Sequence, residues 1–283
     1  MNDMDNSIAF LGPIGSYTHK AAMFFAGELG IEDAVLVECT SFDEVFDAVD
    51  RGRSKYGVVA KENSIEGPVT ATLDNFAFRS SSVILAEKVI DIRHCLVASP
   101  DATIETIKTI ASHPQGLAQC RRYLNERFPG KETVATTSTS ESARRASDDA
   151  TVAGIANALA AELHGCKVMA ADIGDHLGNQ TAFALIGRQG AAESLASDTY
   201  KTSLALWLQN DRAGVLNMIL GEFAFAGINL TMIQSRPLKQ QLGDYMFFAE
   251  FQGRDTDVHA QTALSCLRLK LREVKVLGSY PVL

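Results

Sequence analysis

The sequence predicts an α/β fold over its first 190 residues, followed by a smaller α+β unit of ferredoxin-like order. Up to residue 190, short apolar runs rich in β-forming residues alternate with amphipathic helical patterns, which is typical of a layered fold with a largely parallel sheet. After a small, polar stretch without periodicity at residues 188–201, the order becomes βαββαβ. We therefore expect a first domain at residues 1–190, a linker at 191–200 and a second domain at 201–283.

The apolar runs of the α/β region have the length of buried strands. They are SIAFLG (7–12), AVLVECT (34–40), YGVVA (56–60), VILAEKVID (83–91) and HCLVAS (94–99). Helical patterns lie between and after them, at residues 41–52, 114–128 and 140–150. In the first of these, Ser41 and Glu44 form a capping box and Gly52 ends the helix.

The alternation restarts near residue 151, which predicts a second lobe. A strand is expected at TVAGIAN (151–157), a helix at ALAAELHG (158–165) and another strand at KVMAADI (167–173). A short buried strand then begins at Thr181. These strands suffice for two α/β lobes, the second at roughly residues 93–175, with the chain crossing between them. A cleft at such a boundary is a preferred place for a ligand.

The C-terminal unit has a pattern of its own. Strands are expected at residues 202–210, 229–237, 245–253 and 275–282, and helices at 213–227 and 259–274. This order forms one sheet with two helices on one side. The other face of the sheet must also be buried, and we expect it to pair with a second copy of the chain.

The composition is that of a soluble globular protein, with 46% hydrophobic and 21% charged residues. No apolar stretch approaches the roughly 20 residues needed to cross a bilayer. The polar, acidic N-terminus does not resemble a signal peptide, so we expect a cytoplasmic location and no membrane partner. A net charge of −8 argues against nucleic acid as a partner. The five cysteines form no C-x-x-C pair and the histidines are scattered, which predicts structural thiols and no metal site.

Four polar clusters follow expected strands or start expected helices. They are GPIGSYTH (12–19), KENSIEG (61–67), SHPQGLAQC (112–120) and GNQTAF (178–183). Each has an ordinary structural explanation as a turn or a helix cap. Because the carboxyl ends of parallel strands meet at one edge of a sheet, the four together predict a single small-molecule site. On the residues alone, an enzyme and a binding protein both remain open.

In this order the clusters resemble the motifs of the prephenate dehydratase family. GPIGSYTHKA (12–21) is similar to the family's opening motif, ENSIEG (62–67) to its central motif and SHPQ (112–115) to its helix start. The T-R-F motif before the domain boundary is matched in part by Thr181, Ala182 and Phe183. The C-terminal unit resembles an ACT regulatory domain through GINLT (227–231), SRP (235–237), GDYMFF (243–248) and LGSYP (277–281).

The resemblance implies a two-lobed catalytic region, similar to a periplasmic binding protein, with prephenate held between the lobes. Prephenate would lose its ring carboxylate as carbon dioxide and its C4 hydroxyl as water to give phenylpyruvate, a step of phenylalanine biosynthesis that needs no cofactor. Thr181 is expected to act as general acid or to hydrogen-bond the departing oxygen. Glu62, Asn63 and Ser64 are expected to complete the catalytic set. The implied substrate-binding residues are Ser16, Lys61, Ser112, Asn179 and Phe183.

The ACT resemblance implies feedback by phenylalanine, bound at the interface of a homodimer or homotetramer. Such binding regulates the enzyme only if it distinguishes two states of the protein. The implied effector contacts come from the loop NDRAGVL (210–216) and the strand end QSRP (234–237). They are Asn210, Ala213, Gly214, Val215, Leu216, Gln234, Ser235, Arg236 and Pro237.

Three positions depart from the family pattern. Ala182 stands in place of the arginine, and loss of a bidentate contact to a substrate carboxylate is expected to cost about 1.5–3 kcal/mol. Lys61 stands where an apolar residue is usual, and we consider two hypotheses: it supplies the missing charge in the cleft, or it is an exposed surface lysine. Gln234 replaces a glutamate, which leaves the identity of the effector open.

Two functions other than the dehydratase remain open on the sequence. One is a prephenate-binding sensor on the same scaffold, and the other is an enzyme that decarboxylates prephenate without aromatising it. Retention of Thr181, Glu62, Asn63 and Ser64 favours the dehydratase, because a pure sensor has no need for the hydroxyl. Whether arogenate is also accepted stays open.

Overall fold

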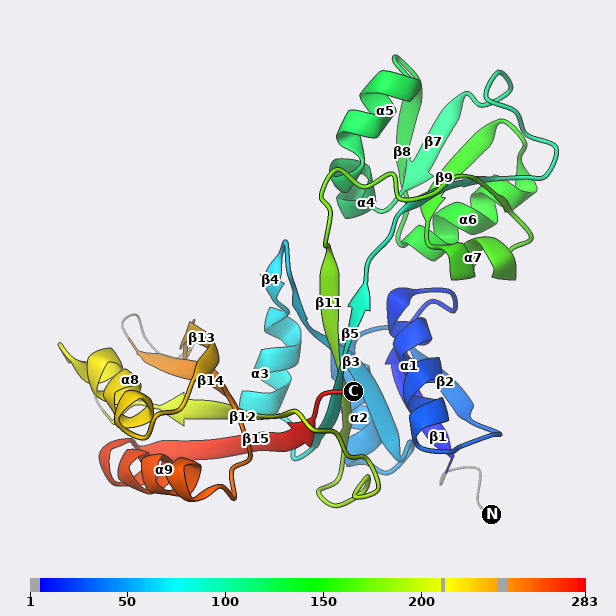
Figure 1. Cartoon of the computed structure of the whole chain (residues 1–283). Helices are drawn as coiled ribbons and strands as arrows, with labels where there is room; N and C mark the ends of the chain where they lie inside the picture. The colour runs from blue at the N-terminus through cyan, green and yellow to red at the C-terminus, as the bar shows by residue number, and fades with distance from the viewer. Residues whose placement is uncertain (1–5, 210–211, 239–243) are drawn as a thin grey trace.

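The structure is a computed structural model that describes residues 6–209, 212–238 and 244–283. It consists of two α/β lobes and a C-terminal α+β domain (Figure 1). The second lobe stands at the top of Figure 1, the first lobe lies below it, and the C-terminal domain lies at the lower left. No helix within the described ranges is long and apolar enough to cross a membrane. The predicted fold class is confirmed.

The first lobe is built on a mixed sheet. Its elements are β1 (Ser7–Leu11), α1 (Tyr17–Glu28), β2 (Val35–Cys39), α2 (Phe42–Asp50), β3 (Tyr56–Asn63), β4 (Gly67–Pro68), α3 (Thr70–Phe78), β5 (Val83–Asp91) and β11 (Gln180–Gly187). The strands run in the order β2-β1-β3-β11-β5, and β4 pairs with β3. β1 is parallel to both its neighbours, whereas β11 is antiparallel to both of its own. Because strand residues alternate between faces, Ile8 and Phe10 pack with α1 and Ala9 packs with α2.

The second lobe has a mixed sheet as well. Its elements are β6 (Cys95–Ala98), β7 (Thr109–Ser112), α4 (Pro114–Gln119), α5 (Arg121–Arg127), β8 (Glu132–Ala135), α6 (Thr139–Asp148), β9 (Val152–Ala156), α7 (Ala158–Leu163) and β10 (Lys167–Ala170). The strands run in the order β10-β6-β9-β7-β8. The short strands β7 and β8 were not expected from the sequence, because neither has a clear alternating pattern.

The single helix expected at residues 114–128 is interrupted at Cys120. The cause is Asp175, which inserts both its backbone and its carboxylate into the helical ladder. Its N–H donates to Gln119 O at 2.7 Å, and its carboxylate accepts the N–H of Arg122 at 3.0 Å. These bonds replace intrahelical ones, so the chain starts a new helix with α5.

The chain crosses between the lobes twice, from β5 to β6 and from β10 to β11 (Figure 1). The two crossings lie side by side. Ile92 donates its N–H to Asn179 O at 2.8 Å, and Ile173 donates to His94 O at 2.9 Å. A paired connection of this kind places the lobes on either side of a hinge.

The C-terminal domain has the predicted βαββαβ order. Its elements are β12 (Tyr200–Trp207), α8 (Val215–Phe225), β13 (Leu230–Pro237), β14 (Tyr245–Gln252), α9 (Val258–Lys270) and β15 (Glu273–Pro281). The strands form an antiparallel sheet in the order β13-β14-β12-β15. Both helices cover one face, where Ile219, Phe223 and Leu267 are buried.

The other face of this sheet packs on the first lobe of the same chain. Trp207, Phe248 and Tyr280 share an apolar core with Phe46 and Phe76 of the lobe. The expectation that a second copy buries this face is therefore wrong. The alternating apolar pattern of the strands predicts that the face is buried, but it does not indicate the covering surface.

Residues 188–199 connect β11 to β12 and are docked on the first lobe. Ala192 and Leu195 are buried beside α1, and the hydroxyl of Tyr56 donates to Ala191 O at 2.8 Å. The small, polar composition predicts a linker here, and these two apolar side chains attach it to the core.

Candidate active site

A cleft of about 500 Å³ lies between the two lobes and is lined by both of them. The first lobe contributes Ser16 at the start of α1, Asn63 at the end of β3 and Thr181 at the start of β11. His94 and Asn179 line the cleft from the two crossings. The second lobe contributes the N-terminal ends of α4 and α6. The four polar clusters of the sequence thus supply residues to one site.

Thr181 and Asn63 are directly opposite each other on β11 and β3. The Asn63 Nδ2 atom lies 2.9 Å from Thr181 Oγ1. The orientation of the Asn63 amide follows from its oxygen, which accepts the N–H groups of Ile65 and Glu66 at 3.0 Å each. Nδ2 therefore donates and the threonine oxygen accepts, so the hydroxyl proton of Thr181 is left to donate elsewhere. The buried side chain of Thr181 faces the cleft.

A chain of amide hydrogen bonds continues from Asn63 across the hinge. Asn63 Nδ2 also donates to Asn179 Oδ1 at 2.9 Å, and Asn179 Nδ2 donates to Gln119 Oε1 at 3.1 Å. The same oxygen lies 2.8 Å from His94 Nε2, which is consequently the protonated ring nitrogen. The chain links the first lobe, both crossings and α4 into one polar floor.

Two buried atoms on this floor have no partner in the described structure. They are His94 Nδ1 and Gln119 Nε2. Both side chains line the cleft and both are more than nine-tenths buried, with exposures of 6% and 8%. Because an unpaired buried polar atom is costly, these two atoms are positioned to bind a ligand. Sequence reasoning missed both residues, since a lone histidine at the start of an expected strand and a glutamine within a helix carry no local signal.

Three helices begin at the cleft wall, namely α1, α4 and α6. Their caps are ordered, because Ser16 Oγ accepts the N–H of His19 at 3.1 Å and Ser138 Oγ accepts that of Glu141 at 3.0 Å. His113 Nδ1 accepts the N–H of Gln115 at 3.3 Å at the start of α4. Helix N-termini carry partial positive charge and free amides, so the starts of α1 and α6 favour an anionic ligand. The helix α4 is only six residues long and begins at Pro114, which has no N–H.

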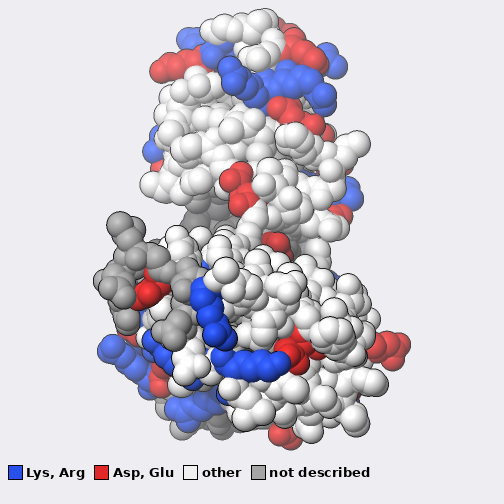
Figure 2. Space-filling view, turned by 90° about the vertical axis from the view of Figure 1, so that its left-hand side faces the viewer, with Lys and Arg blue, Asp and Glu red and all other residues white. Residues whose placement is uncertain are grey.

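Among the described residues, the cleft lining includes no lysine or arginine. On the face shown in Figure 2, most of the Lys and Arg side chains lie toward the top of the second lobe and on the lower part of the molecule, while the surface around the waist is mostly uncoloured. The lining includes the carboxylate of Glu66, so the partial positive charge available to an anion comes from backbone amides.

Four of the predicted site residues lie outside the cleft lining, namely Ser64, Ser112, Glu62 and Lys61, and the two serines have structural contacts. Ser112 is buried in the second lobe and donates its hydroxyl to Ile155 O at 2.9 Å. Ser64 accepts the N–H of Gln180 at 2.9 Å and so fastens the end of β3 to the second crossing. The prediction that Ser112 contacts the ligand is wrong. Ser64 holds β3 and the second crossing together beside the site.

Glu62 is the third such residue, and it is paired across the ladder with Ala182. Thr181 and Phe183, on either side of Ala182, do line the cleft. Position 182 therefore lies on the opposite face of the sheet. An arginine there would meet Glu62 rather than clamp a ligand carboxylate, so the expected loss of a carboxylate clamp does not follow from Ala182.

The hypothesis that Lys61 supplies charge to the cleft is wrong, and so is its alternative as a surface lysine. A register shift in the β3–β11 ladder pairs Phe183 with Ala60 and Ala182 with Glu62, which leaves Lys61 as an extra residue in a bulge. Its side chain is 3% exposed, and its ammonium group bonds to Glu87 and to Glu250 of the C-terminal domain.

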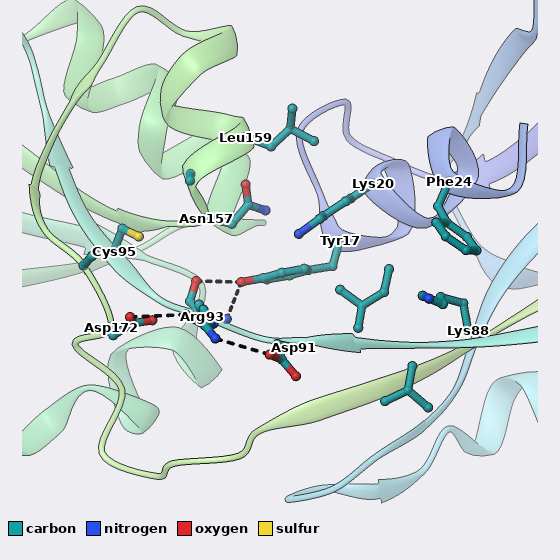
Figure 3. Close-up of a pocket in the computed structure, with 14 residues that line it drawn as sticks. Tyr17, Lys20, Phe24, Lys88, Asp91, Arg93, Cys95, Asn157, Leu159 and Asp172 are labelled. Atoms are coloured by element: carbon teal, nitrogen blue, oxygen red, sulfur yellow. Dashed lines mark hydrogen bonds and ion pairs between the residues drawn. The ribbon is translucent and has the colours of Figure 1, made fainter. Parts of the chain in front are cut away.

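A second hollow of about 590 Å³ lies on the other side of Tyr17, which lines both spaces. As Figure 3 shows, the hydroxyl of Tyr17 meets the first crossing at Arg93. It accepts the N–H of Arg93 at 2.7 Å and donates to the carbonyl oxygen at 2.6 Å. Burial raises the pKa of this phenol far above its usual value. Tyr17 thus ties the start of α1 to the hinge.

The predicted effector contacts occupy the start of α8 and the end of β13. Ala213, Gly214 and Leu216 are exposed, whereas Val215 is buried. On β13, Ser235 and Pro237 are exposed and Gln234 is half-buried. Asn210 lies outside the described residues.

Arg236 has a different partner from the one expected. Its Nε and a terminal nitrogen bind the two carboxylate oxygens of Asp74 on α3, each at 2.8 Å. The guanidinium group therefore joins the C-terminal domain to the first lobe instead of being presented to an effector.

The sequence matches the family model described as prephenate dehydratase over residues 8–191 and that of the ACT domain over residues 202–265. A bifunctional chorismate mutase/prephenate dehydratase of Neisseria gonorrhoeae is 38% identical over 277 residues, which cover 97% of this chain and 74% of the relative.

Two solved structures resemble the whole chain. Prephenate dehydratase from Arthrobacter aurescens in complex with L-Phe has a TM-score of 0.87 and 37% identity, and the match covers 97% of this chain and 90% of the other. GqqA, described as a novel type of quorum quenching acylase, has a TM-score of 0.85 and 26% identity over 98% of each chain.

Proposed function

Because the chain belongs to the prephenate dehydratase family, we propose that the cleft between its lobes converts prephenate to phenylpyruvate. The observation that carries this proposal is the hydroxyl of Thr181. It faces the cleft, and its oxygen is held as an acceptor by Asn63, so that its proton can be donated to a ligand. That is the arrangement required beside a departing hydroxyl group.

In this reaction the bond between the ring and its carboxylate breaks, and carbon dioxide leaves. The electron pair enters the ring as the C4–oxygen bond breaks, and the departing hydroxide takes up one proton from solvent to leave as water. A threonine hydroxyl is a very weak acid, so its contribution is a hydrogen bond that strengthens as charge develops on the departing oxygen. Asn63 orients this donor.

The substrate is a dianion, and the features that support its binding are the N-termini of α1 and α6 at the cleft. We propose that Ser16 and the free amides in the first turns of α1 and α6 hold the two carboxylates. Asn179, His94 and Gln119 present polar atoms to the substrate, and Phe183 lines the cleft from the same strand as Thr181. No cofactor is required. Catalysis then depends mainly on fixed dipoles, since no lysine or arginine of the described residues lines the cleft.

We propose that phenylalanine binds the C-terminal domain and regulates the enzyme. Support comes from the ACT match at residues 202–265 and from the L-Phe complex of the Arthrobacter protein. The contacts proposed for the effector are at the exposed start of α8 and at Gln234 and Ser235 on β13. Exposed apolar side chains on α8, Leu216, Leu220 and Phe225, support assembly into a homodimer or homotetramer. The proposed location is the cytoplasm.

GqqA raises the question of acylase activity. Such a reaction by a threonine nucleophile needs a base beside the hydroxyl. The described partner of Thr181 Oγ1 is an amide that donates to it, which does not activate it as a nucleophile. The site therefore favours the dehydratase.

The test is prephenate turnover, followed through the absorbance of phenylpyruvate in base, for wild type, Thr181→Val and Thr181→Ser. The valine variant keeps the shape of the side chain and removes its hydroxyl, so kcat should fall about 10²- to 10³-fold while prephenate binding by calorimetry changes little. The serine variant should retain most of the activity. Binding without turnover by wild type would indicate a sensor, and carbon dioxide release without phenylpyruvate would indicate the non-aromatising decarboxylase.

A further inference from the structure

A buried group of four charged side chains joins the first lobe to the C-terminal domain. We call it the charge cluster, and it consists of Lys61 on β3, Glu87 on β5, Lys201 on β12 and Glu250 on β14. The ammonium group of Lys61 bonds to both carboxylates. Lys201 Nζ also reaches both, at 2.7 Å from Glu87 and 3.1 Å from Glu250. Two cations and two anions thus form a closed, neutral group.

Three of the four side chains are almost completely removed from water, and the fourth, Lys201, is 23% exposed. Lys61 is 3% exposed, Glu87 0% and Glu250 2%. Further hydrogen bonds satisfy it, because the Tyr280 hydroxyl accepts from Lys61 at 2.9 Å and donates to Glu250 at 2.9 Å. Buried charges are stable only with their partners in place, so a displacement of Glu250 must move Lys61 or leave a charge unpaired.

Lys61 connects this cluster to the catalytic strand. It is the extra residue of the bulge in β3, and Asn63 lies only two residues further along. The carbonyl oxygen of Lys61 accepts the N–H of Val69 at 2.8 Å, which fixes the turn that leads into α3. The bulge places Lys61 on the face of the C-terminal domain while Asn63 faces the cleft.

On its other side, the cluster reaches the strand of the proposed effector contacts. Thr231 on β13 donates its hydroxyl to Glu250 Oε1 at 2.8 Å. Gln234 and Ser235 lie a few residues further along the same strand. A continuous set of contacts therefore runs from β13 through Glu250 and Lys61 to the bulge beside Asn63.

We propose that Lys61 is the positioning residue through which the C-terminal domain sets the geometry of Asn63 and Thr181. A movement of β13 on effector binding shifts Glu250, and Lys61 passes this shift to the bulge and hence to the Asn63 amide. The proposal rests on the function proposed above, in which phenylalanine is the effector and Thr181 assists the departing hydroxyl group. It assigns the regulatory coupling to a residue that does not touch the cleft.

Lys201 provides a matched control. It binds the same two carboxylates as Lys61, but it lies in the C-terminal domain and not on β3. Lys61→Met and Lys201→Met each leave the cluster with one lysine and two carboxylates, so both should lower the melting temperature. Only Lys61→Met should lower kcat, by about tenfold, with KM for prephenate changed less than threefold. Only it should abolish inhibition by phenylalanine.

A charge-balanced variant separates positioning from stability. Lys61→Met combined with Glu250→Gln leaves one lysine and one carboxylate, so its melting temperature should recover toward that of wild type. Its rate should still not respond to phenylalanine. Recovery of the phenylalanine response together with stability would overturn the proposal, and so would an equal loss of response in Lys201→Met.

A second readout does not depend on turnover. The N–H groups of Ile65 and Glu66 donate to the side-chain oxygen of Asn63, so their hydrogen-exchange rates report whether the Asn63 side chain has moved. Adding phenylalanine should change their exchange rates at least threefold in wild type and in Lys201→Met, and leave them unchanged in Lys61→Met. No change in wild type would overturn the proposal. A wild type that shows this change but forms no phenylpyruvate would contradict the proposed function and leave the coupling supported.

Discussion

Asn63 and Thr181 face each other across β3 and β11, and the amide of Asn63 donates to the threonine hydroxyl at 2.9 Å. The two backbone amides that bind the asparagine oxygen fix the direction of this bond. A weakly acidic hydroxyl is useful in catalysis only when its proton points at the departing group. Because Asn63 donates a hydrogen bond to Thr181 and accepts none from it, the hydroxyl proton of Thr181 stays available for the departing group.

Asn63→Asp tests this direction with almost no change in shape. A carboxylate has no N–H, so it would accept the hydroxyl proton of Thr181 and turn it away from the substrate. We expect kcat to fall about 10²-fold or more, in the range seen when an oriented donor is lost. Steady-state kinetics with prephenate measures this, and an aspartate variant with normal kcat would show that the direction of the bond is irrelevant.

Gln119→Glu tests whether the unpaired Nε2 of this residue faces the substrate. The new carboxylate keeps an acceptor for His94 and Asn179 but replaces the free donor with negative charge in a cleft proposed to hold a dianion. KM should rise at least tenfold, which corresponds to about 1.4 kcal/mol, with a smaller effect on kcat. Gln189→Glu makes the same change of charge at an exposed position outside the cleft and should leave KM unaltered.

The elements with clear periodicity were predictable from the sequence. The apolar runs of β1, β2, β3 and β5 and the βαββαβ order of the C-terminal domain all appear where their patterns place them. The break at Cys120 was not predictable, because its cause is Asp175, which is distant in sequence and has no local signature. Helix propensity depends on residues that are close in sequence, so it does not reveal a contact with a residue as distant as Asp175.

The candidate site was predictable in part, and the bulge in β3 explains much of the remainder. Strict alternation would place Glu62 on the same face as Ala60, and Asn63 on the face of Lys61. The extra residue reverses this, so Asn63 lines the cleft and Glu62 does not. A bulge is a property of the pairing of two strands, so a single strand sequence does not reveal it. The unpaired atoms of His94 and Gln119 likewise appear only once the hinge is assembled.

Ala182→Arg tests the placement of the residue that departs from the family motif. Because position 182 lies opposite Glu62 and away from the cleft, the new arginine should form a cross-strand ion pair. We expect a gain in stability of roughly 0.2–1 kcal/mol and a KM for prephenate within threefold of wild type. Thermal unfolding and steady-state kinetics measure the two effects. A tenfold drop in KM would instead restore the idea that an arginine here clamps the substrate.

The charge cluster predicts that the stability of the protein depends on pH, and the carboxylate of Glu250 is the group that shows this dependence. Burial alone would raise the pKa of Glu250, but the attraction of Lys61 and Lys201 outweighs burial and lowers it to about 2. A carboxylate whose pKa is lowered by folding stabilises the protein fully above its ordinary pKa of 4.5, and this contribution is lost as the pH falls from there toward 2. Replacing it leaves two lysines facing one carboxylate.

Melting temperatures of wild type and Glu250→Gln between pH 7 and pH 2.5 measure this contribution. Near neutral pH the variant should be less stable by roughly 3–5 kcal/mol, the usual effect of breaking a buried ion pair. The difference between the two proteins should shrink as the pH falls below about 4.5, since wild type then loses the charge that the variant lacks. Glu126→Gln, at an exposed position on α5, should cause only a small change at every pH. A difference that stays constant down to pH 2.5 would mean that folding does not shift the pKa of Glu250.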